Sequence, residues 1–427
     1  MDYLEFDKKE LVNLEYSLSK ELLRSNKCGA FASTTIVCCN TRKYHGLLVC
    51  PVKAFNNERH VLLSAIHESI IQHGKEFHLG INKYPGGRYH PAGHQYIIDY
   101  NVEPIPVITY RVGGVIFTKA MMLAEDDNRI LIKYTLEEAQ APVNLRLQPF
   151  LAFRHIHSLS KANMEINMKH RKVKNGFSCC LYNEYPDLFL QLSKKNEYIP
   201  VPEWYYNIEY FEEQLRGYEY QEDLMVPGYL ELSLKKGESF VFTAGLKEIS
   251  PMTLKGIFEK QKSKRMPRDN YENCLLNAAQ QFIKIDNDKA EIIAGFPWFG
   301  SWGRDTLISA PGLTLTAGNK KTCKLLIDGI TKKLNGALFP NTCSSGTVVY
   351  NTIDAPLWYF WTIQQYAVFT NDYKNIWNEY GKKLKNILKG YRDGTEYNIK
   401  MQENGLIFGG SDEVALTWMD AVVNGRP

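Results

Sequence analysis

Three short segments of this 427-residue chain combine tryptophan with acidic side chains. The first is "GFPWFGSWGRDTLISAPGL" (295–313), in which Trp302, Arg304 and Asp305 lie within four residues. A pyranose ring stacks its apolar C–H face on an indole, and its vicinal hydroxyls bind carboxylate acceptors and the forked donors of arginine. This segment therefore favours a sugar pocket. Alternatively, Asp305 only complements a helix dipole, with Arg304 as its surface partner.

The second segment is "YNTIDAPLWYFW" (350–361). Asp354 and Pro356 fit the first turn of a helix, as a capping residue and a proline do. Trp358 then follows one turn later, so an acceptor and an indole again stand together at a helix start. The alternative is that this tryptophan belongs to a hydrophobic core.

The third segment is "SDEVALTWMDA" (411–421), where Asp420 follows Trp418 on a largely apolar stretch. A carboxylate in such surroundings either caps a backbone group or has its pKa raised by desolvation, as a general acid requires. These three segments hold five of the seven tryptophans, at positions 298, 302, 358, 361 and 418. We therefore expect Asp305, Asp354 and Asp420 to meet around one sugar-sized hollow.

The elements that must position these residues differ between the two halves of the chain. Up to about residue 250 the pattern is β-rich, with a hairpin predicted in "VITYRVGGVIFTKAMML" (107–123) around Gly113-Gly114. Many strands with short turns predict a large antiparallel sandwich. Further β-rich runs are "RILIKYTLEE", "VNLRLQPFLAF", "PDLFLQLSKK" and "ESFVFTAGLKE".

After about residue 270 the apolar residues recur with helical spacing. Three such stripes are Cys323, Leu326, Ile327 and Ile330; Leu357, Phe360, Trp361 and Val368; and Ile376, Trp377, Tyr380, Leu384, Ile387, Leu388 and Tyr391. A charged, proline-containing stretch separates the two patterns. We therefore predict a β-sandwich domain over residues 1–255, a linker over 256–272 and a helical domain over 273–427.

Composition excludes several classes of function. The net charge is only +4 and no basic block is interleaved with aromatics, so nucleic acid is not an expected partner. No run of about 18 apolar residues occurs, and the charged N-terminal stretch is not a secretion signal, so no membrane partner is expected. The nine cysteines lack metal-site spacing and predict reduced thiols in a cytoplasmic protein. We expect no metal and no cofactor.

In this order and spacing, "WFGSWGRDTLIS", "YNTIDAPLWY" and "LTWMDA" resemble the amylo-α-1,6-glucosidase domain of glycogen debranching enzymes, and more distantly the glucoamylases. The stretch "CCNTRKYHGLLV" (38–49) resembles the N-terminal domain of the bacterial and archaeal members. The resemblance implies a β-supersandwich followed by an (α/α)6 toroid of helical hairpins. It also implies hydrolysis, with inversion, of the α-1,6-linked glucose at a branch point of glycogen or a limit dextrin.

The resemblance implies roles for individual residues. Asp420 would be the general acid, while Trp302, Arg304, Asp305, Asp354, Trp358 and Trp418 would bind the substrate; in the alternative assignment Asp305 is the acid. An inverting reaction also needs a base about 6.5–9.5 Å from the acid. Family members continue to a glutamate base, which we expect beyond residue 427. We therefore expect this chain to hold about half of the toroid and to be inactive alone.

Two other functions remain open from the sequence. The first is an α-glucan-binding protein without catalysis, because aromatic and acceptor groups are present and no base is identified. The second is a glucoamylase-like glycosidase of another linkage preference. The 38–49 motif is expected to form a turn or an interdomain contact, and its role in function is not legible from the residues.

Overall fold

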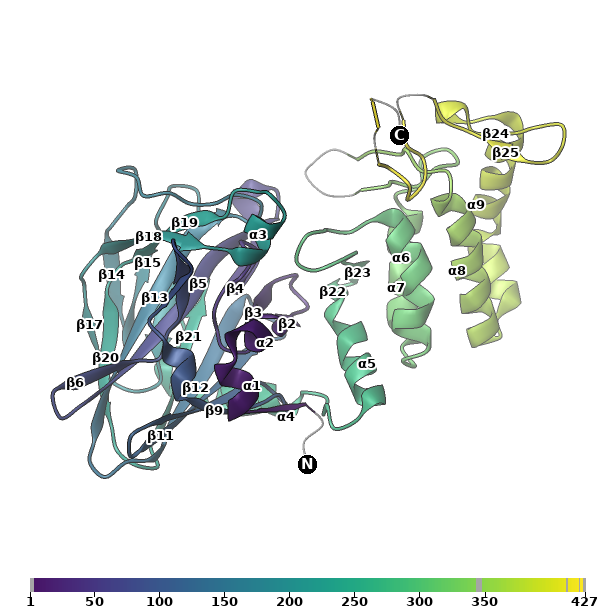
Figure 1. Ribbon diagram of the computed structural model, residues 1–427. Helices are drawn as coiled ribbons and strands as arrows, with labels where there is room; N and C mark the ends of the chain where they lie inside the picture. Colours follow the sequence, from purple (N-terminus) through teal and green to yellow (C-terminus); the bar gives the residue numbers. More distant parts are fainter. Residues whose placement is uncertain (1–3, 343–347, 412–413, 422, 425–427) are drawn as a thin grey trace. The chain divides into compact units, whose positions relative to one another are not determined.

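The computed structural model describes residues 4–342, 348–411, 414–421 and 423–424. The chain divides into two compact units, Met1–Asn277 and Ala278–Pro427, which we call the β unit and the helical unit (Figure 1). An antiparallel β-sandwich followed by a helical region is the fold class predicted from the sequence, and it is confirmed. Among the described residues, no helix is both long and apolar enough to cross a bilayer.

The first sheet of the β unit has nine strands, all paired antiparallel. In spatial order they are β1 (Glu5–Asp7), β9 (Ile97–Asn101), β10 (Val107–Val112), β11 (Val115–Leu123), β12 (Arg129–Glu138), β21 (Ser239–Gly245), β16 (Leu188–Leu192), β15 (Gly176–Cys179) and β14 (His170–Val173). The predicted hairpin is confirmed, because Val112 pairs with Val115 across the turn. Gly113 occupies that turn with φ of 58°, a conformation that glycine adopts without strain.

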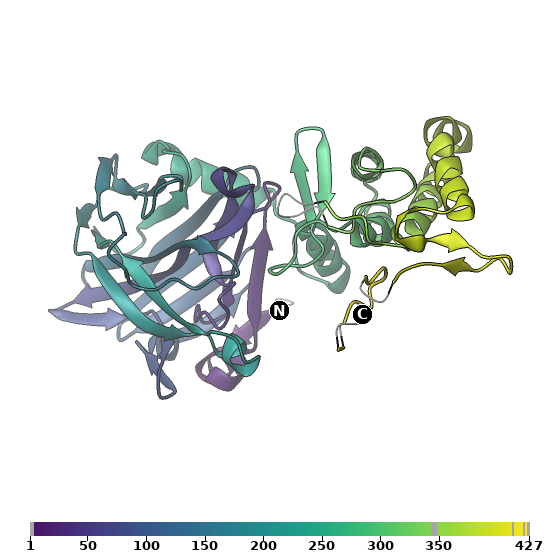
Figure 2. The same ribbon diagram turned by 90° about the horizontal axis from the view of Figure 1, so that it is seen from above.

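The second sheet has ten strands and packs face to face against the first (Figure 2). Its main path is β17 (Glu197–Ile199), β20 (Tyr229–Leu234), β13 (Val143–His155), β5 (Glu58–Gln72), β4 (Gly46–Val52), β3 (Phe31–Thr35) and β2 (Glu21–Ser25), while β19 (Gln221–Val226) pairs with β13 and with β18 (Glu203–Glu209), and β6 (Lys75–His78) pairs with β5. A separate hairpin joins β7 (Asn82–Tyr84) to β8 (Arg88–His90).

The core of the sandwich comes from inward-facing residues of both sheets. Strand β11 alternates buried and half-buried residues over its first six positions, as a strand with one face against a core does. Tyr134 of β12 stacks between Phe117 and Phe240, with ring centroids 5.5 and 5.2 Å away. This packing gives the β unit a continuous hydrophobic core of its own.

Short helices cover the edges of the sandwich. They are α1 (Lys8–Val12), α2 (Leu14–Leu18), α3 (Phe211–Leu215) and α4 (Leu254–Ser263), with single 3-10 turns at Lys53–Phe55, Gly93–Tyr96 and Pro251–Thr253. Helix α5 (Tyr271–Gln281) spans the boundary between the two units. Helix α4 extends into the interval 256–272 expected to be a linker and covers residues 256–263 of it. Its Leu254 and Phe258 are buried against strand residues, so this part of the interval belongs to the β unit despite its charged sequence.

The helical unit begins with a hairpin of β22 (Ile283–Asp286) and β23 (Lys289–Ile292). Its helices are α6 (Gly303–Ala310), which continues into a π-helical turn (Pro311–Leu315), α7 (Lys320–Thr331), α8 (Ala355–Thr370) and α9 (Tyr373–Asp393). A 3-10 turn (Glu396–Asn398) and the two-residue strands β24 (Lys400–Met401) and β25 (Ile407–Phe408) follow. Figure 1 shows α8 and α9 side by side, joined by a tight turn.

The predicted helical stripes are confirmed in α7 and corrected in the other two helices. All four residues predicted for α7 are buried. On α9 five of the seven are buried, but Trp377 and Leu388 are more than half exposed. The stripe predicted for α8 is wrong, because Leu357 and Val368 are exposed and the buried face runs through Tyr359 and Ile363. Helix α8 is apolar nearly all round, so periodicity alone does not select its buried face.

Candidate active site

A buried ion pair joins the first two predicted segments. Nε of Arg304, on α6, donates to both carboxylate oxygens of Asp354 at 2.8 Å. The hydroxyl of Thr352 donates to Asp354 at 2.8 Å and accepts from the Arg304 guanidinium at 3.4 Å. The arginine side chain is only 8% exposed, so this pair fixes the start of α6 to the start of α8.

From the sequence we expected Arg304 to pair with Asp305, but in the structure Arg304 pairs with Asp354. Consecutive residues of a helix point about 100° apart, so neighbours in the first turn of α6 do not face each other. Asp354 is the N-cap residue of α8, yet its side chain caps no backbone group. The hydroxyl of Thr352 takes that place by accepting from the backbone N–H of Ala355 at 3.3 Å. The sequence analysis missed Thr352, although it stands two residues before Asp354 in "NTIDA".

Asp305 lies in the first turn of α6 and is half-buried. Within the described part of the chain its carboxylate forms no hydrogen bond or ion pair. A carboxylate in the first helical turn complements the helix dipole, so this position is consistent with a purely structural role. It also leaves both carboxylate oxygens available to a ligand.

Backbone contacts place Trp302 against the turn that follows α7. Trp302 is the N-cap residue of α6, bridges to Thr342, and packs its ring edgewise on Phe299 with centroids 5.7 Å apart. The backbone N–H of Gly303 donates to the carbonyl of Asn341 at 3.0 Å. An added Cβ at Gly303 would lie 2.1 Å from the carbonyl oxygen of Pro340, so only glycine fits this approach.

The same turn continues to the other two segments. The side-chain amide of Asn341 donates to Asn351 at 3.4 Å, and the Asn351 amide donates to the carbonyl of Ala415 at 3.3 Å. The backbone N–H of Ile353 donates to the carbonyl of Leu416 at 2.9 Å. A continuous set of hydrogen bonds therefore joins the residues around 302, 351 and 415, one contact in each of the three predicted segments.

Asp420 lies four residues beyond this anchor. Four extended residues reach at most about 14 Å, so Asp420 stays within that distance of Leu416. Figure 1 shows this last segment at the end of the helical unit where α6 and α8 begin. Both Asp420 and Trp418 are exposed, the latter by 71%. The expected desolvation of Asp420 is therefore not present in this chain.

Trp358 lies on the second turn of α8 and packs its ring edgewise on Trp361, with centroids 5.7 Å apart. Both rings are half-buried, and Trp358 also packs against the core of the helical unit. This position supports the core interpretation of Trp358 as much as the binding interpretation. Asp412 and Glu413, which precede Trp418, lie outside the described residues.

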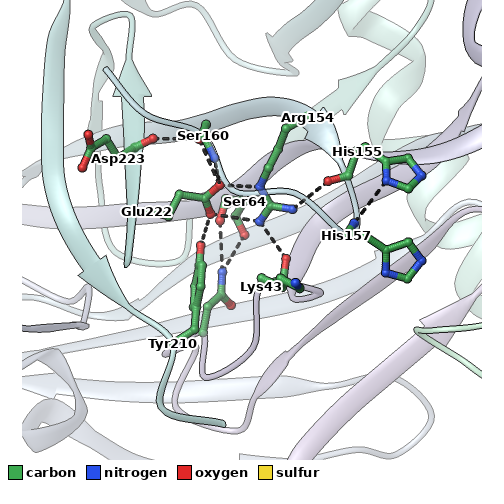
Figure 3. A network of polar contacts seen from close by, with 10 residues as sticks. Lys43, Ser64, Arg154, His155, His157, Ser160, Tyr210, Glu222 and Asp223 are labelled. Atoms are coloured by element: carbon green, nitrogen blue, oxygen red, sulfur yellow. Dashed lines mark hydrogen bonds and ion pairs between the residues drawn. The ribbon is translucent and has the colours of Figure 1, made fainter. Parts of the chain in front are cut away.

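Residues 38–45 of the 38–49 motif form a turn that is fastened inside the β unit, and residues 46–49 begin β4 (Figure 3). The Arg154 guanidinium donates to the carbonyl of Lys43 at 2.7 Å and forms a buried ion pair with Glu222. Burial alone would lower the pKa of Arg154, but the Glu222 carboxylate outweighs this effect and raises it. Within the same turn, the backbone N–H of Thr41 donates to the ring of the fully buried His45 at 3.1 Å. The first part of the motif is therefore a turn, which is one of the two structures expected from the sequence.

No group of three or more histidine, cysteine or acidic side chains is arranged to hold a metal ion in the described ranges. The eight cysteines that the structure describes are all free thiols. A cavity of about 440 Å³ in the helical unit lies between the turn at 335–338 and the C-terminal end of α9. None of the predicted site residues lines it.

Two family models match the chain, one for each unit. A model described as "Glycogen debranching enzyme N terminal" matches residues 20–241, more than half of the chain. A second, described as "Amylo-alpha-1,6-glucosidase", matches residues 276–427 and so contains all three predicted segments.

Two solved structures are similar over most of the chain, at low identity. One, described as a kojibiose phosphorylase from human microbiome, is 12% identical and matches 90% of this chain with a TM-score of 0.47. The other, a bacterial glucoamylase in complex with acarbose, is 10% identical and matches 92% with a TM-score of 0.44. This chain covers 58% of the length of each.

Proposed function

The chain belongs to the glycogen debranching enzyme family, and from this premise we propose that it serves the hydrolysis of α-1,6-linked glucose at branch points. The proposed substrate is glycogen or its limit dextrin, which places the reaction in the cytoplasm. The observation that carries the proposal is the set of hydrogen bonds joining Gly303, Asn341, Asn351 and Ala415. It supports one binding region made from all three segments.

In this proposal Asp420 is the general acid that protonates the departing glycosidic oxygen. An inverting reaction then needs a second carboxylate to activate water on the opposite face of the sugar. No carboxylate of the chain is assigned that role, so the proposal names the acid alone. Because Asp420 is exposed in the free chain, bound substrate would have to exclude water from it.

The remaining residues are proposed to bind the sugar. Trp302 and Trp418 offer indole faces for stacking, and Asp305 offers two free carboxylate oxygens to hydroxyl groups. Arg304 and Asp354 bind each other, so their proposed part is to position Asp305 and the start of α8, with any contact to substrate made by their remaining polar atoms. Trp358 is proposed to shape the wall of the same region.

Glucan binding without hydrolysis is a second candidate. The exposure of Asp420 favours it, because an exposed side chain lacks the closed, water-excluding surroundings that active sites provide. Under this function the same aromatic and acceptor groups would hold an α-glucan that remains intact.

Glucose release from a phosphorylase limit dextrin, measured on the full gene product, tests the first function. Wild type and Asp420→Asn are compared, with Asp288→Asn in an exposed turn as a matched control. We expect Asp420→Asn to lower kcat by about 10²–10⁴-fold while dextrin affinity is retained, because an acid acts mainly on the transition state. Binding without glucose release would favour the second function, and release from linear maltooligosaccharides alone would indicate a glucoamylase-like preference.

A further inference from the structure

The cavity beside the C-terminal end of α9 has features of a binding site that the proposed reaction does not use. Its volume of about 440 Å³ lies within the range of about 300–1,000 Å³ that is usual for small-molecule sites. Asn386, Lys389, Gly390 and Asp393 line one wall. Their spacing of three and four residues puts them on one face of the helix.

Several polar groups in the wall have no side-chain partner among the described residues. Within the residues that the structure describes, the side chains of Asn335, Asn386, Lys389 and Glu396 form no hydrogen bond or ion pair. Together they offer two amides, an ammonium and a carboxylate, so donors and acceptors are both present. A ligand that needs both kinds of group fits this wall better than one that carries a single charge.

Part of the cavity lining is apolar. It consists of Ala337, Leu338 and the half-buried ring of Tyr350, whose hydroxyl donates to the carbonyl of Lys333 at 3.3 Å. A Cβ added at Gly390 would lie 2.4 Å from Cβ of Ala337, so helix α9 approaches this turn as closely as a glycine allows. A fixed tyrosine face beside unpartnered amides is suited to a pyranose ring.

We propose that this cavity, here called the α9 pocket, binds a segment of linear α-1,4-glucan chain. Its lining residues Asn335, Asn386 and Lys389 are exposed, so the pocket is open along the surface and admits a polymer whose ends extend beyond it. The lining carries one ammonium and two carboxylates, which favours an uncharged polyhydroxyl ligand over a phosphate or an acidic peptide. The inference rests on the proposed function, because that function supplies the glucan as the class of substrate.

The α9 pocket is connected to the candidate active site through short stretches of chain. Tyr350 stands four residues before Asp354, and the hydroxyl of Tyr391, between two lining residues, donates to the carbonyl of Ile353. A branched glucan therefore can hold one of its linear arms in the α9 pocket while a branch point lies near α6 and α8. The pocket would act on substrate affinity and not on the chemical step.

Isothermal titration calorimetry with maltoheptaose tests the proposal on the intact chain. We expect the double variant Asn386→Ala/Lys389→Ala to raise Kd about tenfold, because both side chains would lose their hydrogen bonds to the glucan. Lys383→Ala, an exposed lysine of the same helix that does not line the pocket, is the matched control and should leave Kd unchanged. Both altered side chains are exposed, so the fold should be retained, as a thermal melt checks.

An unchanged Kd in the double variant, or an equal loss in Lys383→Ala, would overturn the inference. The outcome is separable from that of the proposed function, because glucose release from limit dextrin is measured independently. Release with an unaltered maltoheptaose Kd leaves the reaction standing without the α9 pocket. A tenfold loss of affinity without any release supports the pocket and contradicts hydrolysis.

Discussion

A single nitrogen of Arg304 donates to both carboxylate oxygens of Asp354, each at 2.8 Å. The two residues are 50 positions apart and stand at the first turns of different helices, α6 and α8. Because the arginine is almost fully buried, the pair acts as a structural link between helix ends. Asp305 lies next to Arg304 but takes no part in this link. Asp354 is therefore a structural residue, whereas the carboxylate of Asp305 has no partner among the described residues and can bind a ligand.

The first prediction uses this difference between Asp354 and Asp305. Asp354→Asn leaves the buried Arg304 cation without a counter-charge, so we expect a loss of about 2–3 kcal/mol in the free energy of unfolding. Asp305→Asn should change stability by less than about 0.5 kcal/mol but weaken glucan binding. Tryptophan fluorescence during urea unfolding measures the helical unit, because six of the seven tryptophans follow residue 277. Equal destabilisation by both variants would contradict this assignment.

The second prediction concerns the close approach at Gly303. Gly303→Ala puts a methyl group against the carbonyl oxygen of Pro340, so α6 must shift, at an expected cost of about 1–3 kcal/mol. The shift would also move Arg304 and weaken glucan binding. Gly312→Ala is the control, since its added Cβ meets no atom within 4 Å and alanine has the higher helix propensity. Unfolding in urea should show the control unchanged or stabilised; a neutral Gly303→Ala would refute the prediction.

The third prediction concerns the ion pair that fastens the 38–49 turn. Glu222 is fully buried and accepts from Arg154, from the Tyr210 hydroxyl, and from Ser160 through its backbone and side chain at 2.9 Å each. Glu222→Gln leaves the Arg154 charge uncompensated, so we expect about 3–5 kcal/mol of destabilisation of the β unit, measured by circular dichroism in urea.

Glu138→Gln is the matched control for Glu222→Gln. Glu138 pairs with Lys236 on the surface, where both side chains are more than half exposed. Such a pair contributes less than about 1 kcal/mol. A loss in the Glu222 variant no larger than in the control would mean that the buried network does not hold the turn.

The fourth prediction is a dependence of β-unit stability on pH. Burial, together with the charge of Lys119, lowers the pKa of His67 to about 3. The folded state therefore keeps this ring neutral where the unfolded chain, with a pKa near 6.5, takes up a proton. The neutral ring makes its full contribution to the free energy of unfolding above about pH 6.5. That contribution falls by about 1.4 kcal/mol per pH unit as the pH drops towards 3.

His67→Phe isolates the contribution of this ring. Between pH 7 and pH 5, wild type should lose about 2 kcal/mol more stability in urea than the variant does. The ring of His67 packs on that of Phe150, with centroids 4.3 Å apart, and faces Gly80, so the variant will also change the stability at every pH. Only the slope of the unfolding free energy against pH is therefore diagnostic. Identical slopes would show that His67 does not set the acid sensitivity.

Much of the β unit was predictable because its local signals agree with its packing. The run "RILIKYTLEE" coincides with β12, and Gly113-Gly114 forms the predicted turn. Helix α9 was predictable for the same reason, since its apolar stripe and its polar face are distinct. Helix α4 was not, because its sequence is mostly charged and only Leu254 and Phe258 hold it to a sheet.

The proximity of the three segments was predictable from the sequence, but the contacts between them were not. Tryptophan and aspartate close together in the sequence marked the three segments, which hydrogen bonds do bring together. The partner of Arg304 was not predictable, because side-chain direction on a helix matters more than nearness in sequence. Asn341 carried no signal at all: a lone asparagine in a turn is ordinary, and only its position between the segments gives it importance.

Both backbone groups of Ile353 are engaged, its N–H by the carbonyl of Leu416 and its C=O by the hydroxyl of Tyr391. An amide whose acceptor lies in another segment exchanges its hydrogen with solvent when that segment detaches. The exchange rate of this one amide therefore reports how often the segment ahead of Asp420 leaves its place, and slower exchange on adding a dextrin would show that the ligand holds it there.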